Sequence, residues 1–295
     1  MKPELQNLID LDRERVLVAH IASLLAWDQE THMPPGAEEE RAEQLAWLEG
    51  SAHEKAVDPR IGEHLAALGC SDSNPGGDPS LDPDARAFLR VLYRTYAREV
   101  KLPADLVTET AKAQSLGQSA WVRARSENDF SAFRPHLERI LDLKRRAAAC
   151  LDPDKKPYDV LLDLFEPGSD EAQVRRVFDP LRKDLSSLLA RIRSKPQVDD
   201  SFLRKPCSKE AQTTASRYFM ELLGYDLDRG RLDVTAHPFT TTVGRADVRI
   251  TTRYDEGYFL SSLFSTIHET GHALYEQGVN RSEERRVGKE CRSRW

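Results

Sequence analysis

The chain has 295 residues, with 43 lysines and arginines against 49 aspartates and glutamates, so its net charge is −6. Without the six basic and three acidic residues that follow position 280, residues 1 to 280 carry 37 basic and 46 acidic side chains. This acidic balance argues against a nucleic-acid-binding surface and is compatible with an enzyme acting on peptides or small substrates.

The cysteines and the N-terminus indicate the compartment. The four cysteines form no CxxC pair, which is typical of free thiols in a reducing environment. Residues 1 to 16 mix both charges and lack the apolar block of a signal peptide. The most apolar stretch, residues 16 to 27, is too short to cross a bilayer. We therefore expect a cytoplasmic protein without a membrane span.

Apolar residues recur at intervals of three and four along most of the chain, which predicts a mainly α fold. Helices are expected over Phe130–Leu151, Glu171–Arg193 and Lys209–Leu223. Ser208 is the candidate N-cap of the last helix, and Gly224 ends it. Turn-rich segments at 69–84, 152–157 and 194–206 separate the helices without marking domain boundaries.

Residues 232 to 254 break the helical pattern. This segment is rich in threonine and valine, which suit a pleated surface, so two or three short strands are expected. A small sheet immediately before a helix offers an edge to which an extended peptide can add as a further strand.

Residues 256 to 277 are expected to form a helix that contains the sequence HETGH. On a helix, His268 and His272 are four residues apart and project from one face, so both imidazoles can reach one tetrahedral metal ion. Glu269 lies one position further round, beside the metal and not on it. The alternative is a helix that simply exposes two histidines to solvent.

The HETGH spacing corresponds to a hydrolytic mechanism. A zinc ion lowers the pKa of a bound water towards neutrality, and a nearby carboxylate such as Glu269 can accept the proton and deliver it to the leaving amine. The motif alone does not distinguish an exopeptidase from an endopeptidase. Cobalt and other divalent ions also bind imidazole and carboxylate sites.

Several separate stretches resemble the carboxypeptidase Taq family of metallopeptidases. His237–Phe239 is similar to the family's HPF motif, Asp247–Thr251 to its DxRxT motif, and both precede HETGH in the family's order. Residues 27 to 37, WDQETHMPPGA, and residues 158 to 168, which end in EPG, are also similar. The resemblance covers residues 1 to about 280.

The resemblance implies a mainly helical metallopeptidase fold with a deep groove and a small β-sheet next to the HExxH helix. It implies one divalent metal, zinc or cobalt, and removal of single amino acids from the C-termini of peptide substrates. A cytoplasmic homodimer is implied as well. Residues 1 to 280 are then the N-terminal part of one metallocarboxypeptidase domain.

Two further residues are candidate substrate contacts. His237 can donate a hydrogen bond to a substrate carbonyl, although a purely structural loop is the alternative. Arg249 is expected to support the site, yet it lies two residues from Asp247 on one strand face, where the two side chains can pair with each other. Residues 27 to 30 have a structural interpretation, in which the tryptophan packs and the acidic residues cap or bridge helices.

A catalytic zinc ion normally has three protein ligands, and only two are assigned here. The family's third ligand is a glutamate some two dozen residues after the second histidine, at or beyond Trp295. Glu276 is too far along the helix. Residues 281 to 295 change abruptly to a basic string and are expected to be a non-native tail, so Glu283, Glu284 and Glu290 are not assigned as ligands. We expect weak metal binding, and an inert scaffold that retains the motif remains an alternative.

Overall fold

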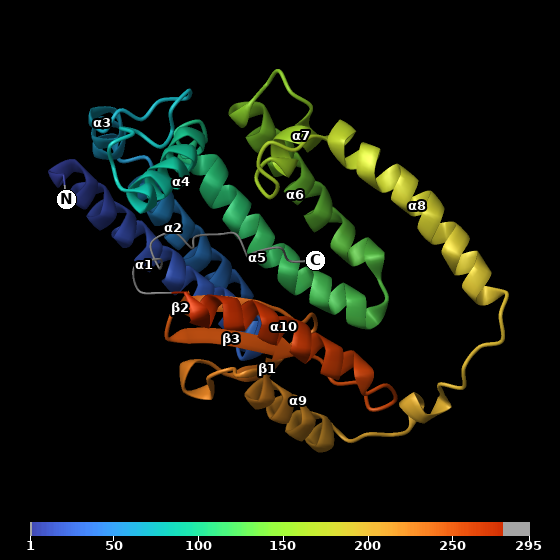
Figure 1. Cartoon of the computed structure of the whole chain (residues 1–295). Helices are drawn as coiled ribbons and strands as arrows, with labels where there is room; N and C mark the ends of the chain where they lie inside the picture. Colours follow the sequence, from blue (N-terminus) through green and yellow to red (C-terminus); the bar gives the residue numbers. More distant parts are fainter. Residues whose placement is uncertain (1, 280–295) are drawn as a thin grey trace.

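The computed structural model describes residues 2–279, and its N-terminal part is a layer of long helices lying side by side (Figure 1). Helix α1 packs against α2, α2 against α5, and α5 against α6. A 3₁₀ turn at Pro35–Ala37 joins the first two. The bounds are α1 Pro3–Thr31, α2 Glu38–Ala56, α5 Ala104–Glu127 and α6 Phe130–Leu151.

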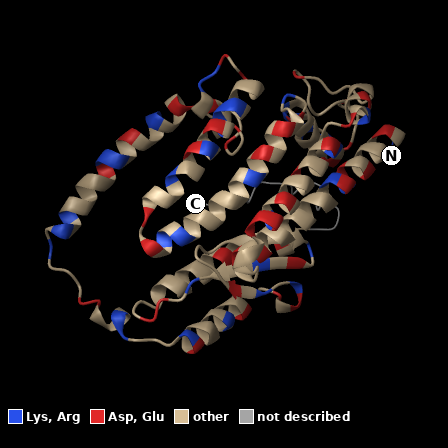
Figure 2. Ribbon diagram, turned by 180° about the vertical axis from the view of Figure 1, so that it is seen from behind, with Lys and Arg blue, Asp and Glu red and all other residues tan. Residues whose placement is uncertain are grey.

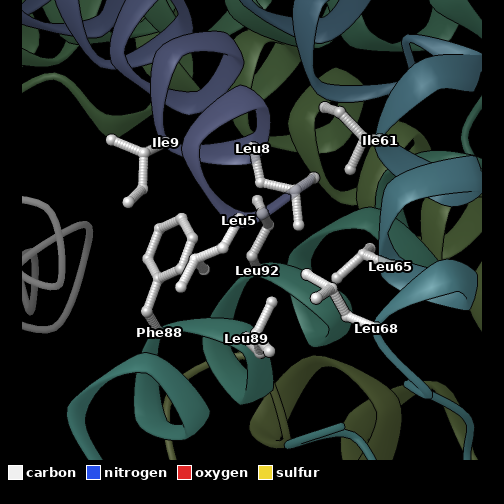
Figure 3. Packing of buried hydrophobic residues seen from close by; sticks show 9 residues of the cluster. All are labelled: Leu5, Leu8, Ile9, Ile61, Leu65, Leu68, Phe88, Leu89 and Leu92. Carbon is white, nitrogen blue, oxygen red and sulfur yellow. The ribbon is translucent and has the colours of Figure 1, made fainter. Parts of the chain in front are cut away.

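Two shorter helices, α3 (Pro59–Ala67) and α4 (Pro83–Glu99), close one end of this layer against α1. Each begins with a proline after an aspartate, Asp58 or Asp82, whose carboxylate accepts a backbone N–H of the first turn. Apolar side chains from the three helices meet in one cluster (Figure 3). Its members are Leu5, Leu8, Ile9, Ile61, Leu65, Leu68, Phe88, Leu89 and Leu92.

Helices α7 (Pro157–Leu162) and α8 (Glu171–Arg193) follow α6. Helix α7 packs against α6, whereas α8 lies apart from the helical layer in Figure 1 and buries none of its residues. A segment containing a 3₁₀ turn at Ser201–Arg204 leads from α8 to α9 (Lys209–Leu223). A third 3₁₀ turn, Leu227–Arg229, precedes the sheet.

The sheet has three strands in the order β1-β3-β2, with β1 parallel and β2 antiparallel to β3. Strand β3 is therefore central, and α10 packs against β2, β3 and α9. Strand β2 also contacts α1, which joins the sheet to the helical layer. The bounds are β1 Leu232–Val234, β2 Thr240–Gly244, β3 Asp247–Thr252 and α10 Leu260–Gly278.

The expected mainly α fold, with a small sheet next to the HExxH helix, is confirmed. The helices expected at 130–151, 171–193 and 209–223 have these same bounds, and Ser208 caps α9 through its hydroxyl. The motif helix begins at Leu260 and not at residue 256, because Asp255 accepts the backbone N–H of Gly257 and closes a turn.

Other expectations concern thiols, membrane spans and the chain end. Cys70, Cys150 and Cys207 are free thiols. Within residues 2–279, no helix has the length and apolar content needed to cross a membrane. The prediction of a non-native tail, together with Cys291, Glu283, Glu284 and Glu290, lies outside the described residues. The division into one domain and a tail stays a prediction.

Candidate metal centre

Helix α10 brings His268 and His272 together on adjacent turns. Their Nε2 atoms lie 3.2 Å apart, and their ring centroids are 4.8 Å apart with an interplanar angle of 78°. Two nitrogen ligands of a tetrahedral zinc ion, each at about 2.0 to 2.1 Å from the metal, are about 3.3 Å apart. The two imidazoles therefore fit a shared divalent ion, and the same spacing also suits an N–H···N hydrogen bond between them.

Glu269, between the two histidines in sequence, is buried on the side of α10 that faces the sheet. Its Oε2 atom lies 2.7 Å from the hydroxyl of Thr240 in β2, and its backbone carbonyl oxygen lies 2.9 Å from the same hydroxyl. A hydroxyl has one proton to donate, and the shorter contact is the one to the carboxylate. Thr240 thus fixes the position of the acidic side chain relative to the histidine pair.

Buried hydroxyl groups hold α10 in place. The Thr266 hydroxyl lies 3.1 Å from that of Ser216 in α9 and 3.2 Å from that of Thr252 in β3. Ser262 donates to the amide oxygen of Gln212 in α9 at 2.5 Å. Because buried polar groups need partners, this network ties the motif helix to two neighbouring elements and limits how it can shift.

The side chain of Arg249 contacts two other residues of this chain. It donates two hydrogen bonds to the carboxylate of Asp247, at 2.8 and 2.7 Å, as expected for neighbours on one strand face. Its guanidinium also lies 4.1 Å from the ring centroid of buried Trp27, and Arg231 lies on the same ring at 5.0 Å. This stacking joins α1 to the sheet, and a role of Arg249 in substrate binding stays a prediction.

His237 lies in the turn between β1 and β2. The Thr235 hydroxyl donates to its carbonyl oxygen at 2.8 Å, and Phe239 two residues later is buried. The imidazole itself makes no hydrogen bond with any residue between 2 and 279. Its half-buried ring is therefore available to a ligand, and its role as a substrate contact stays a prediction.

The structural interpretation of residues 27 to 30 is confirmed. Trp27 is buried, Asp28 forms an ion pair with Arg41 of α2 at 2.7 Å, and Glu30 accepts from Gln118 of α5 at 3.0 Å. These contacts hold α1 against its neighbours. Within residues 2–279, no group of three histidine, cysteine, aspartate or glutamate side chains is arranged to bind a metal. Glu276 is buried eight residues beyond His268 on the same helix, as expected from the sequence.

No feature of the sequence distinguished Thr240 as a site residue. Threonines recur through residues 232 to 254 and suit strands in general, so the sequence pattern does not separate Thr240 from the threonines around it. The pairing of Trp27 with Arg249 was also missed, because the two residues are far apart in sequence. Only the three-dimensional arrangement brings α1, β2 and β3 around the motif helix.

Comparisons with known proteins agree with the geometry. A model of the carboxypeptidase Taq (M32) metallopeptidases matches residues 7–293. The chain is 40% identical to Thermostable carboxypeptidase 1 of Thermus thermophilus, over 95% of this chain and 56% of the relative. It is 36% identical to Carboxypeptidase 1 of Bacillus subtilis, over 93% of this chain and 54% of the relative. The chain thus spans about half the length of the curated relatives that it matches.

Solved structures of similar fold cover nearly the whole chain. The crystal structure of BsuCP matches with a TM-score of 0.89 at 33% identity, over 95% of this chain and 55% of that one. An M32 carboxypeptidase from Deinococcus radiodurans matches with a TM-score of 0.79 at 36% identity, over 95% and 55% of the two chains. The resemblance inferred from the HPF, DxRxT and HETGH motifs is therefore confirmed: this chain belongs to the carboxypeptidase Taq (M32) family of metallopeptidases.

Proposed function

We propose that this chain contributes the HETGH part of a metallocarboxypeptidase that releases single amino acids from the C-termini of peptides. His268 and His272 are the proposed ligands of one divalent ion, with zinc the first choice and cobalt the alternative. The observation that carries the proposal is the 3.2 Å separation of their Nε2 atoms, next to a buried carboxylate.

Glu269 is the proposed general base and acid. A bound divalent ion supplies Lewis acidity at this site, which makes a water easier to deprotonate and stabilises developing negative charge. The Thr240 hydroxyl occupies Oε2 of Glu269, so Oε1 is the atom expected to accept the water's proton and to return it to the leaving amine. Burial of the carboxylate holds it in one orientation during both transfers.

His237 and Arg249 are the proposed substrate contacts. The His237 ring, without a hydrogen-bond partner between residues 2 and 279, can donate to a peptide carbonyl or oxyanion. Arg249 already contacts Asp247 and Trp27. Two contributions are therefore proposed for it: it stabilises the arrangement of the site, and it contacts the peptide. The third metal ligand is proposed to come from outside residues 2–279, and a deep groove around the metal is part of the same proposal.

The remaining proposals follow from family membership. Peptides are the proposed substrates, with neither nucleic acid nor membrane as a partner. The full-length protein is proposed to be a cytoplasmic homodimer. Residues 1 to 280 are proposed to be the N-terminal part of one metallocarboxypeptidase domain.

Peptide hydrolysis with and without a chelator tests this function. A zinc-loaded full-length protein that contains this chain should release the last residue of a free peptide, lose this activity with 1,10-phenanthroline, and regain it when zinc is restored; the 295-residue chain alone is assayed alongside it. A peptide whose C-terminus is amidated should not be cleaved, because an exopeptidase needs the free carboxylate. Internal cleavage of the amidated peptide would indicate an endopeptidase. Absence of hydrolysis would indicate an inert scaffold, and hydrolysis that is equal in the Glu269→Gln variant would contradict the proposed role of Glu269.

A further inference from the structure

The three named residues of the DxRxT motif, Asp247, Arg249 and Thr251, lie on one face of the sheet, because alternate residues of a strand share a face. Helix α10 packs on the other face, where Val248 belongs to one apolar cluster with Ala273. Asp247 and Arg249 bind each other, whereas the Thr251 hydroxyl contacts the HPF turn, residues 235–239. Thr251 is therefore the motif residue that connects β3 to this turn.

The hydroxyl of Thr251 is fully buried and holds the backbone of Phe239. Its Oγ1 atom accepts the Phe239 N–H at 2.8 Å, and the Thr251 N–H donates to the Phe239 carbonyl oxygen at the same distance. The hydroxyl proton has two acceptors at 3.1 Å, the Phe239 carbonyl oxygen and Thr235 Oγ1. A buried backbone N–H that loses its acceptor destabilises the arrangement around it, so the Thr251 hydroxyl restricts the turn.

A second buried hydroxyl extends this contact to His237. Thr235 donates to the His237 carbonyl oxygen at 2.8 Å, so its single proton is used there and its oxygen can accept from Thr251. Pro238, which follows His237, has no N–H and a fixed φ. The two hydroxyls thus hold the backbone on both sides of Pro238.

The HPF turn has no charged side chain of its own. Charged residues lie in bands along the helices in Figure 2, whereas residues 234–244 contain no lysine, arginine, aspartate or glutamate. The half-buried imidazole of His237 makes no hydrogen bond with any residue between 2 and 279. The backbone that carries this ring therefore determines where it lies, and hydroxyl groups hold that backbone.

We propose that Thr251 is a positioning residue for His237, because its hydroxyl keeps the HPF turn in the arrangement in which the imidazole meets a peptide. The inference rests on the proposed substrate contact of His237 and adds the residue that orients it. The alternative is that Thr251 only fills space in the sheet. Valine, which is β-branched and suits strands, would then replace it without loss.

Kinetics on the full-length protein that contains this chain tests the proposal. Thr251→Val should lower kcat/KM about tenfold, the effect of one lost hydrogen bond, and Thr251→Ser should retain it. If Thr251 acts through His237, Thr251→Val should change kcat/KM by no more than about twofold in a His237→Ala background.

Thr241→Val is the matched control and should leave kcat/KM unchanged. Thr241 lies opposite Arg249 in the sheet register, on the same face as Thr251. Its hydroxyl forms no hydrogen bond with any residue between 2 and 279, so the substitution removes a hydroxyl without removing a contact.

Hydrogen exchange measures the same contact without hydrolysis. In NMR spectra of the full-length protein with isotope-labelled phenylalanine, the Phe239 amide should exchange about tenfold faster in Thr251→Val than in the unsubstituted protein, and no faster in Thr251→Ser. Circular dichroism checks that each variant is folded. If Thr251→Val does not fold, Thr235→Val, which removes the bond to the His237 carbonyl, takes its place, and the same coupling to His237→Ala is expected.

Two outcomes would overturn the proposal while the proposed function stands. In the first, the valine variant hydrolyses peptides as fast as the unsubstituted protein. In the second, it loses as much activity in the His237→Ala background as in the unsubstituted one, so that Thr251 acts elsewhere. If His237→Ala itself has no effect, the proposed substrate contact is wrong and the positioning role with it. Faster exchange of the Phe239 amide would then show that Thr251 holds the turn for a structural reason only.

Discussion

The hydroxyl of Thr240 lies 2.7 Å from Oε2 of Glu269, so a strand of the sheet anchors the acidic residue of the HETGH motif. Without this anchor, Glu269 would depend on helix α10 alone for its orientation. The relationship connects the sheet, whose central strand carries the DxRxT motif and whose strand β2 follows the HPF motif, to the proposed proton transfer.

Replacing Thr240 with valine should lower kcat about tenfold, because a hydrogen bond to a charged group contributes about 1.5 kcal/mol or more. KM should stay within about twofold, since Thr240 positions a side chain and is not proposed to bind the peptide. Steady-state kinetics on the zinc-loaded full-length protein measures both. Thr240→Ser keeps the hydroxyl and should restore kcat; a serine variant as slow as the valine variant would contradict the positioning role.

Gly230→Ala should destabilise the protein by about 3 kcal/mol. A Cβ at this position would overlap the Tyr225 hydroxyl and the Val248 carbonyl oxygen, which are themselves hydrogen-bonded at 2.6 Å. Gly244→Ala is the control, because its Cβ would meet no atom closer than His20 Nδ1 at 3.9 Å. Thermal unfolding should show a clear loss of Tm for the first variant only, and equal Tm values would show that the turn tolerates a side chain.

The acid sensitivity of α4 packing depends on Asp163. Burial alone raises the pKa of Asp163, but the backbone N–H of Gly168 and the guanidinium groups of Arg98 and Arg94 outweigh it and hold the pKa below its usual value. The stabilisation is therefore present above the unfolded pKa of about 3.9 and is lost as the pH falls through the lower folded value. The carboxylate is partly exposed, so its contribution after screening is about 1 kcal/mol.

Asp163→Asn should accordingly lower Tm by about 2 °C at pH 7, and the difference should shrink as the pH falls below the unfolded pKa of about 3.9 and through the lower folded pKa. Asp184→Asn, on exposed helix α8, serves as the control and should leave Tm unchanged at both pH values. Differential scanning calorimetry across this pH range measures the effect. A difference that persists unchanged at low pH would contradict the ionic origin of the stabilisation.

Arg249→Lys distinguishes a structural role from a substrate contact. Lysine cannot keep both hydrogen bonds to Asp247 and the stacking on Trp27, so the free energy of unfolding should fall by about 1 to 2 kcal/mol. Arg253→Lys, at an exposed arginine, should change it little. Chemical denaturation measures both variants. If stability is unchanged and KM rises, Arg249 contacts the peptide and its role in joining α1 to the sheet is minor.

The helices could be predicted from the sequence where local signals mark both ends. Helix α9 is an example, since Ser208 supplies its N-cap and Gly224 its left-handed end, with a φ of 93°. The motif helix was predicted four residues too long at its start. There, the decisive signal was the turn closed by Asp255, which resembles a helix start in composition.

The site could be predicted only where its residues are close in sequence. The pattern HETGH placed His268, Glu269 and His272 together because a helix relates residues three and four apart. No such rule relates Thr240 to Glu269, or Trp27 to Arg249, because these contacts depend on how the sheet packs against α10 and α1. The pattern of threonines and valines likewise does not predict the strand order β1-β3-β2.

Zinc titration by isothermal calorimetry tests the central claim, that His268 and His272 bind one metal ion together. The unsubstituted protein should bind one zinc ion per chain in the micromolar range, since the described residues hold no group of three candidate ligands and only two are proposed. His268→Ala and His272→Ala should each weaken binding at least tenfold, and the double variant should not bind. The same affinity and stoichiometry in the double variant as in the unsubstituted protein would contradict the account.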